Sequence, residues 1–254
     1  MKRHELPLRL GSLLLAAGLL LAWEAACRTL RLSALVLPPP SAVAQSLWQG
    51  LASGYFWPHL RTTVAELLLG VTLGCTVGFL TGILLGEHAL LRRLLMPYVV
   101  ASQVIPKLAL APLFVLWFGF GMAPTVVITA LICFFPLMEN TLTALQQVAP
   151  ERLELFRMLG ATRAQTLWRL KLPSGLPAIL AGLRVAVVLA LVGAVVGEFI
   201  AASKGLGALV IASQGTMDTS LMFAVLVLIS ALGLVLYQAT LLLERWLLAP
   251  FRTS

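Results

Sequence analysis

One stretch of the chain interrupts an otherwise strongly apolar sequence and decides how the rest can be arranged. It reads Glu154-Leu-Phe-Arg-Met-Leu-Gly160-Ala-Thr-Arg-Ala-Gln-Thr-Leu-Trp-Arg-Leu170-Lys-Leu-Pro173, inside a polar segment that runs from Gln146 to about Leu176. Basic residues alternate here with leucines, a pattern typical of short amphipathic helices at a membrane surface. We expect Gly160 to break the segment into two such helices. An ordered amphipathic loop between buried segments predicts a docking surface for another protein.

The composition around this loop is that of a membrane protein. The 254 residues are 60% hydrophobic and 11% charged, whereas soluble domains carry about 25% charged residues. The formal net charge of +8 does not indicate nucleic-acid binding, because the basic residues lie at the ends of apolar segments, where anionic headgroups and insertion rules account for them. Cys27, Cys75 and Cys133 are far apart in apolar stretches, so we interpret them as small core residues.

Six apolar segments are long enough to cross the hydrocarbon core as helices, which takes about 20 residues each. They are Leu10–Thr29, Leu60–Gly86, Leu94–Phe118, Pro124–Leu145, Ala178–Ala201 and Leu221–Leu247. We therefore predict an all-α polytopic membrane protein with about six transmembrane helices. The basic N-terminus ahead of Leu10 could begin a cleaved signal peptide, but the length of the apolar stretch favours an uncleaved first span.

The basic residues also orient these spans. Most of the 18 Lys and Arg residues fall near the two termini, at Arg92 and Arg93, or in the Gln146–Leu176 loop. The opposite side carries Arg28, Arg31, Arg61 and Lys204. This bias predicts that both termini and the loop are cytoplasmic.

The topology divides the chain into three parts. Residues 1–59 should hold the first span and an extracytoplasmic loop with a short interfacial helix, which Ser41 would cap after three rigid prolines. Residues 60–247 should form a core of five transmembrane helices that includes the cytoplasmic loop 146–176. Residues 248–254 would be a cytoplasmic tail.

Glycine recurs at every fourth position along the second span. Small residues at this spacing let a neighbouring backbone approach closely, which is how helices associate in lipid. The stripe therefore predicts tight packing inside one subunit, and a surface that slides during gating is the alternative. The residues are Gly70, Gly74, Gly78, Gly82 and Gly86.

The third span is the best candidate to line a pathway. Pro97, Pro106 and Pro112 interrupt it, and broken helices at membrane depth are tolerated where protein or a cavity satisfies the backbone. Ionisable groups inside spans are functional candidates, so Lys107 and Glu198 could belong to a polar site near the outward mouth. A structural pair that only satisfies itself is the other interpretation. The candidate pathway residues are Gln103, Pro106, Lys107 and Glu198.

The sequence lacks the motifs of common catalytic sites. No lysine follows a glycine, as the phosphate-cradling Gly-Lys-Ser/Thr loop requires. The histidines His4, His59 and His88 are far apart without an HExxH pair, and no Gly-x-Ser-x-Gly turn occurs. We therefore expect a chain that is not an enzyme and that holds no catalytic residue, metal or cofactor of its own.

The segment from Glu154 to Pro173 resembles the cytoplasmic signature of permease subunits of ATP-binding-cassette (ABC) importers. That pattern is Glu-Ala-Ala, three residues, Gly, nine residues, then Ile-x-Leu-Pro. Leu155-Phe156 stands here for Ala-Ala, and Leu170 stands for Ile. The residues that the resemblance assigns to coupling with the ATPase are Glu154, Leu155, Phe156, Gly160, Ala161, Leu170, Leu172 and Pro173.

Two further stretches are similar to one branch of that family, and the resemblance extends over about Leu60 to Leu247. They are Pro106-Lys-Leu-Ala-Leu-Ala-Pro-Leu-Phe-Val-Leu-Trp-Phe-Gly119 and Gly197-Glu-Phe-Ile-Ala-Ala-Ser-Lys-Gly-Leu-Gly207. The branch imports nitrate, sulfonates, taurine and bicarbonate, and its relatives carry pyrimidine vitamin precursors, riboflavin or aromatic acids. The resemblance leaves the individual substrate open.

The resemblance implies a type I ABC importer permease fold in the bacterial cytoplasmic (inner) membrane. The expected partners are a cytoplasmic ABC ATPase dimer that binds ATP and Mg, an extracytoplasmic solute-binding protein, a second permease subunit in a homodimer, and membrane lipid, with no nucleic acid. The loop would supply a coupling helix to the ATPase. A self-sufficient secondary transporter is the alternative, and it predicts internal repeats and midplane charges. A membrane-embedded enzyme is a third hypothesis, without a supporting constellation of residues.

Overall fold

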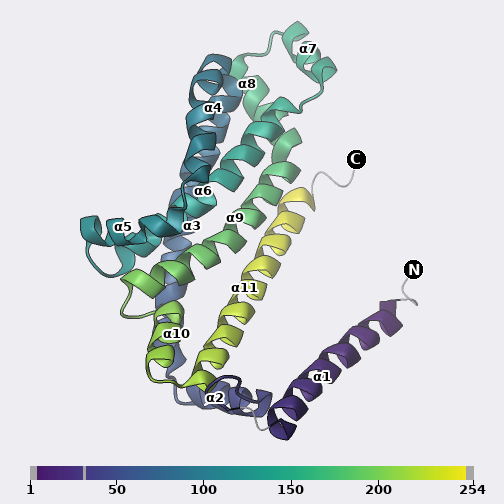
Figure 1. Ribbon diagram of the computed structural model, residues 1–254. Helices are drawn as coiled ribbons and strands as arrows, with labels where there is room; N and C mark the ends of the chain where they lie inside the picture. The colour runs from purple at the N-terminus through teal and green to yellow at the C-terminus, as the bar shows by residue number, and fades with distance from the viewer. Residues whose placement is uncertain (1–4, 31–32, 250–254) are drawn as a thin grey trace. The chain divides into compact units, whose positions relative to one another are not determined.

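The computed structural model describes residues 5–30 and 33–249, and the regular structure of these residues is helical. Figure 1 shows the order of the helices. They are α1 (Glu5–Thr29), α2 (Pro40–Ala52), α3 (Phe56–Glu87), α4 (Ala89–Val104), the 3₁₀ helix η1 (Lys107–Leu110), α5 (Ala111–Phe118), α6 (Met122–Gln146), α7 (Pro150–Met158), α8 (Arg163–Thr166), the π-helix η2 (Leu167–Lys171), α9 (Leu172–Ala201), α10 (Leu206–Gly215) and α11 (Thr219–Leu248). The predicted all-α class is confirmed.

Among the described residues, four helices are long and apolar enough to cross a membrane, and a bent pair would make a fifth span. The four are α3, α6, the continuous helix Arg163–Ala201 and α11. The first predicted span, Leu10–Thr29, lies within α1. The predicted count of six therefore stays a prediction.

The predicted interruption of the third span, Leu94–Phe118, by proline is confirmed. α4 and the η1–α5 segment meet at an angle of 79°. The break falls at Pro106, which has no N–H to donate and fixes its own φ. Ile105, the residue before it, is extended at φ −68° and ψ 123°, as the proline ring requires of its neighbour.

The chain forms two compact units. One holds Met1–His59 with Leu209–Ser230, and the other holds Leu60–Ala208 with Ala231–Ser254. The smaller unit thus contains the first part of α11 together with residues 1–59. Residues 250–254, which make up most of the predicted tail 248–254, lie outside the described residues, as do the basic residues Lys2, Arg3, Arg31 and Arg252.

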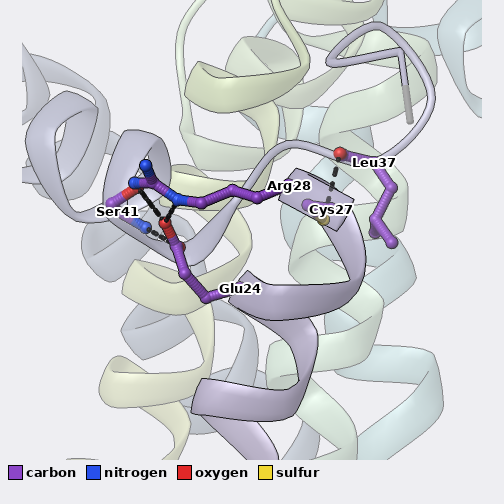
Figure 2. Close-up of polar contacts among 5 residues, drawn as sticks. All are labelled: Glu24, Cys27, Arg28, Leu37 and Ser41. Carbon is purple, nitrogen blue, oxygen red and sulfur yellow. Dashed lines mark hydrogen bonds and ion pairs between the residues drawn. The ribbon is translucent and has the colours of Figure 1, made fainter. Parts of the chain in front are cut away.

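In the smaller unit, the side chain of Glu24 joins α1 to the start of α2, as Figure 2 shows. Its Oε2 accepts the Ser41 backbone N–H at 3.0 Å and its Oε1 accepts the Ser41 hydroxyl at 2.8 Å. Arg28 donates to the same Oε1 at 2.6 Å. The prediction that Ser41 caps α2 was wrong: the N-cap is Pro39, and a carboxylate from another helix satisfies the free amide.

In the larger unit, α6 packs between α3 and α9 (Figure 1). The paired positions rise together along α3 and α6, so these two helices are parallel. Along α9 the order is reversed, because Gly175 meets Ala144 whereas Gly197 meets Thr125. Cys75 and Cys133 lie in the apolar core between these helices, and both are free and buried.

The glycine stripe of α3 faces α6. A Cβ atom placed on Gly78 would lie 2.5 Å from the Phe134 carbonyl oxygen, and one on Gly82 would lie 2.7 Å from that of Met138. A Cβ on Gly74 would collide with the Ala130 carbonyl. Backbone atoms cannot move aside as a side chain can, so the absence of Cβ atoms is what lets α3 and α6 approach this closely.

Candidate functional site

Helix α7 begins the polar loop and presents an apolar surface to solvent. Leu155 is 50% exposed, and Met158 and Leu159 are 80% and 74% exposed. Large apolar side chains exposed together on a polar loop mark an interaction surface. Sequence reasoning did not single out Met158, although its place beside Leu159 and Gly160 was a usable signal.

Gly160 ends α7 in the left-handed conformation, with φ +70°. The Gly160 N–H donates to the Arg157 carbonyl and the Ala161 N–H donates to the Phe156 carbonyl, each at 3.0 Å. These two bonds form a Schellman-type helix end, in which glycine avoids the Cβ penalty. A Cβ on Gly160 would meet no atom within 4 Å, so backbone conformation rather than space favours glycine here.

The next helix starts at once with a capping box. The Thr162 hydroxyl accepts the Gln165 N–H at 3.2 Å, and the Gln165 side chain accepts the Thr162 N–H at 2.8 Å. This reciprocal pair satisfies two free donors at the helix start. The turn is therefore ordered on both sides of Gly160.

The prediction of a separate second short helix after Gly160 was wrong. Instead, α8, η2 and α9 form one helix of 39 residues, Arg163–Ala201. Within it, the Leu172 N–H bonds to the Leu167 carbonyl in a π turn. The register shift falls directly before Pro173, which has no N–H to place in the ladder. A displacement of the loop would thus pass into the long apolar helix without an intervening hinge.

Burial divides the predicted coupling residues into an exposed or half-buried group and a buried pair. Glu154, Leu155 and Gly160 are exposed, and Phe156, Ala161 and Pro173 are half-buried. Leu170 and Leu172 are only 7% and 9% exposed, and Leu172 belongs to the apolar core. The last two residues anchor the helix below the loop instead of offering a surface to a partner.

A polar cavity of about 390 Å³ lies beneath the loop. Lys171 and Glu87 form an ion pair at 2.7 Å on its wall. This pair ties the end of α3 to the base of the loop. The lining residues are Glu87, Leu153, Arg157, Ala161, Arg163, Thr166 and Lys171.

The pathway candidates of the third span meet at its bend. The Lys107 ammonium donates to the Gln103 Oε1 at 2.7 Å, across the break between α4 and η1. The Gln103 Nε2 is buried without a hydrogen-bond partner among the described residues. Pro106, between them, is exposed.

Glu198 has different partners. It is completely buried and binds Thr63 and the Gly207 backbone. No contact in the described part of the chain joins it to Lys107, so the four candidates do not form one cluster. Sequence reasoning missed Thr63, whose role depends on α3 and α9 coming together.

These features define a helical multi-pass membrane protein with an exposed, ordered polar loop that leads directly into one of its spans. The family model for the "binding-protein-dependent transport system inner membrane component" matches residues 74–248. The chain therefore belongs to the permease family of binding-protein-dependent ABC transport systems, and the resemblance read from the loop is confirmed.

Three relatives match over nearly the whole chain. The riboflavin transport system permease protein of Chloroflexus aurantiacus is 39% identical, over 97% of this chain and 92% of the relative. The formylaminopyrimidine transport permease protein of Halalkalibacterium halodurans is 38% identical, over 92% of each. The taurine transport system permease protein of Escherichia coli is 31% identical, over 95% of this chain and 89% of the relative.

A solved structure carries the same fold. An inward-facing form of the MetNI methionine ABC transporter matches with a TM-score of 0.65, over 74% of this chain and 93% of the matched chain. At 22% sequence identity, this likeness establishes the fold alone. The predicted ABC importer permease fold is confirmed.

Proposed function

We propose that this chain forms the translocation pathway of an importer whose ATP hydrolysis takes place on separate ATPase subunits that dock at the loop 146–176. A solute-binding protein delivers the substrate on the other side, where the bend at Pro106 lies beside Lys107 and Gln103. Two permease subunits, in a homodimer, complete the pathway. Both termini and the loop are cytoplasmic.

The observation that carries the proposal is the exposed apolar surface of Leu155, Met158 and Leu159 next to an ordered turn. Exposed apolar groups of this size are stabilised when a partner covers them. The turn leads into the continuous helix Arg163–Ala201, which supplies a rigid connection into the membrane. Closure of the ATPase dimer on ATP would move the loop, and the attached span would tilt between inward- and outward-facing states.

The substrate class that we propose is a small heterocyclic vitamin or vitamin precursor. The riboflavin and formylaminopyrimidine permeases are 39% and 38% identical to this chain, whereas the taurine permease is 31% identical. A calorimetric screen of the cognate solute-binding protein with riboflavin, formylaminopyrimidine and taurine tests the assignment. Binding of taurine alone would exclude the heterocyclic class.

Docking is tested with purified chain in nanodiscs and the cognate ATPase. We expect the double variant Leu155→Ser, Leu159→Ser to insert normally and to lose ATPase binding, because both side chains are exposed. The permease alone should release no phosphate from ATP. Wild-type ATPase affinity in the double variant would contradict docking at this surface.

A size-matched pair of variants that differ in charge tests the same surface at the turn. Asn and Asp both tolerate the left-handed conformation, so Gly160→Asn and Gly160→Asp differ mainly in charge. We expect Gly160→Asp to lose ATP-driven uptake while Gly160→Asn keeps most of it. Normal uptake by Gly160→Asp would argue against a docked partner at this position.

A further inference from the structure

A buried acidic pair lies where the turn after α9 meets α3. Glu66 comes from α3 and Glu198 from the end of α9. Their exposed fractions are 1% and 0%. Thr63, one helical turn before Glu66, is also fully buried. All three belong to the unit that contains Leu60–Ala208.

Glu198 and Thr63 together hold the first amides of α10. The Glu198 Oε1 accepts the Thr63 hydroxyl at 2.6 Å, and its Oε2 accepts the Gly207 N–H at 2.5 Å. The Thr63 Oγ1 in turn accepts the Leu206 N–H at 2.8 Å. Free N–H groups at a helix start need such acceptors when they are buried.

The turn before α10 is fitted closely around the Glu198 carboxylate. Gly205 adopts φ +137°, and a Cβ atom there would collide with the Glu198 carboxyl group. A Cβ on Gly207 would lie 2.9 Å from the Glu198 Oε2. The two glycines therefore give the backbone access to the carboxylate, which fixes where the turn lies.

Glu66 completes the cluster with its own carboxyl group. This group is close enough to the Glu198 carboxyl group to interact with it, and its Oε2 is buried with no hydrogen-bond partner among the described residues. Arg61 and Lys204 are the nearest basic residues along these segments, and both are exposed. Among the described residues, neither Arg61 nor Lys204 forms an ion pair with Glu66 or Glu198.

A hydrogen bond between two carboxyl groups requires a proton. Two ionised carboxylates side by side in a low-dielectric interior repel each other and lose their hydration. With the Thr63 hydroxyl and the Gly207 N–H donating to it, Glu198 is the better site for the negative charge, because hydrogen bonds to the charged form favour that form. Glu66 accepts no donor at Oε2, so it is the better site for the proton.

We propose that Glu66 and Glu198 share one proton, carried by Glu66 and donated to Glu198, and that this pair positions the turn between α9 and α10. Both are positioning residues, since they act on the backbone of the turn. The inference concerns the resting chain and does not depend on the proposed substrate or on ATPase docking.

Infrared spectroscopy of the purified chain in nanodiscs at neutral pH tests the proton directly. We expect a carbonyl stretch of a protonated carboxyl group that shifts in heavy water and disappears in Glu66→Gln. Glu24→Gln is the matched control, because Glu24 pairs with Arg28 and should be ionised, so the band should remain. If Glu66→Gln removes no such band, the shared proton is excluded.

Amide and alanine variants test the positioning role. Glu66→Gln replaces the acid O–H with an amide donor, so we expect the wild-type melting temperature and most of the uptake. Glu66→Ala removes the donor and should lower uptake about tenfold or more, as expected when a buried charged acceptor loses a partner. Equal losses in Glu66→Gln and Glu66→Ala would overturn the proposal. The infrared result needs no transport, so it also stands apart from a failure of the proposed function.

Discussion

The Lys171 Nζ lies 2.7 Å from the Glu87 Oε1, 84 residues earlier in the chain. This ion pair joins the end of α3 to the base of the loop 146–176, and both side chains are about four-fifths buried. It therefore holds the start of the 39-residue helix to a second span.

The first prediction concerns this ion pair. Lys171→Met should lower the free energy of unfolding by roughly 1–3 kcal/mol, because it leaves Glu87 partly buried without its partner. The exchanged double variant Glu87→Lys, Lys171→Glu should recover more than half of the loss. Thermal unfolding in nanodiscs measures both, and additive losses in the double variant would show that the two charges do not interact.

The second prediction concerns the backbone at Gly160. Gly160→Val should lower the free energy of unfolding by about 1–2 kcal/mol, because a β-branched residue is strained at φ +70° even with open space around it. Gly160→Asn should cost less, since Asn adopts this conformation more readily. Protease accessibility of the loop checks the order, and a more accessible loop in Gly160→Asn than in Gly160→Val would contradict it.

The third prediction grades the glycines by what a methyl group would meet. Gly74→Ala and Gly78→Ala should destabilise α3 against α6, because the obstacle is backbone. Gly86→Ala should cost less, since the nearest atom is the Leu145 Cδ1 at the end of a flexible side chain. Gly78→Ala should lower the free energy of unfolding by about 1–3 kcal/mol, as overpacking of a tightly packed core does.

The matched control for this series is Gly18→Ala in α1. No atom lies within 4 Å of a Cβ at this position, so the change should be neutral or slightly stabilising. Unfolding in detergent and crosslinking of Cys75 with Cys133 report on the α3–α6 packing. Equal effects of Gly18→Ala and Gly78→Ala would show that packing is not what the stripe provides.

The fourth prediction concerns the junction of α1 and α2. Glu24→Ala should speed amide hydrogen exchange at Ser41, because it removes the acceptor of that N–H. Glu24→Gln should have a smaller effect, since the amide oxygen can still accept. Exchange followed by mass spectrometry tests this, and unchanged protection at Ser41 in Glu24→Ala would mean that another group holds α2.

The helix boundaries show where sequence patterns suffice. Apolar length located α3, α6, α9 and α11, because a span needs a continuous run of residues that are soluble in lipid. Pro106 was recognised as an interruption, but the 79° bend depends on how α4 and α5 each pack on their neighbours. Single-sequence patterns carry no information about those contacts.

The continuity of α8 with α9 is a feature that sequence patterns did not predict. Gly160 was predicted to break the loop, and proline commonly breaks a helix as well, yet only Gly160 ends one. Pro173 is accommodated because a π turn precedes it and because Leu170 and Leu172 are buried in the core. Tertiary packing thus overrode the local tendency of proline to break a helix, which amounts to about 3 kcal/mol or more in a helix interior.

The sequence by itself determined the class of protein, the positions of most spans and the exposed polar loop, because hydrophobicity, glycine spacing and a twenty-residue motif are local properties of the chain. Only the tertiary structure decided which polar groups are partners. It separated Glu198 from Lys107. It placed Glu198 beside Thr63 and Glu66, which lie 135 and 132 residues earlier in the chain. Such pairs depend on helices that meet in space, where burial and hydrogen bonding decide which charges can persist.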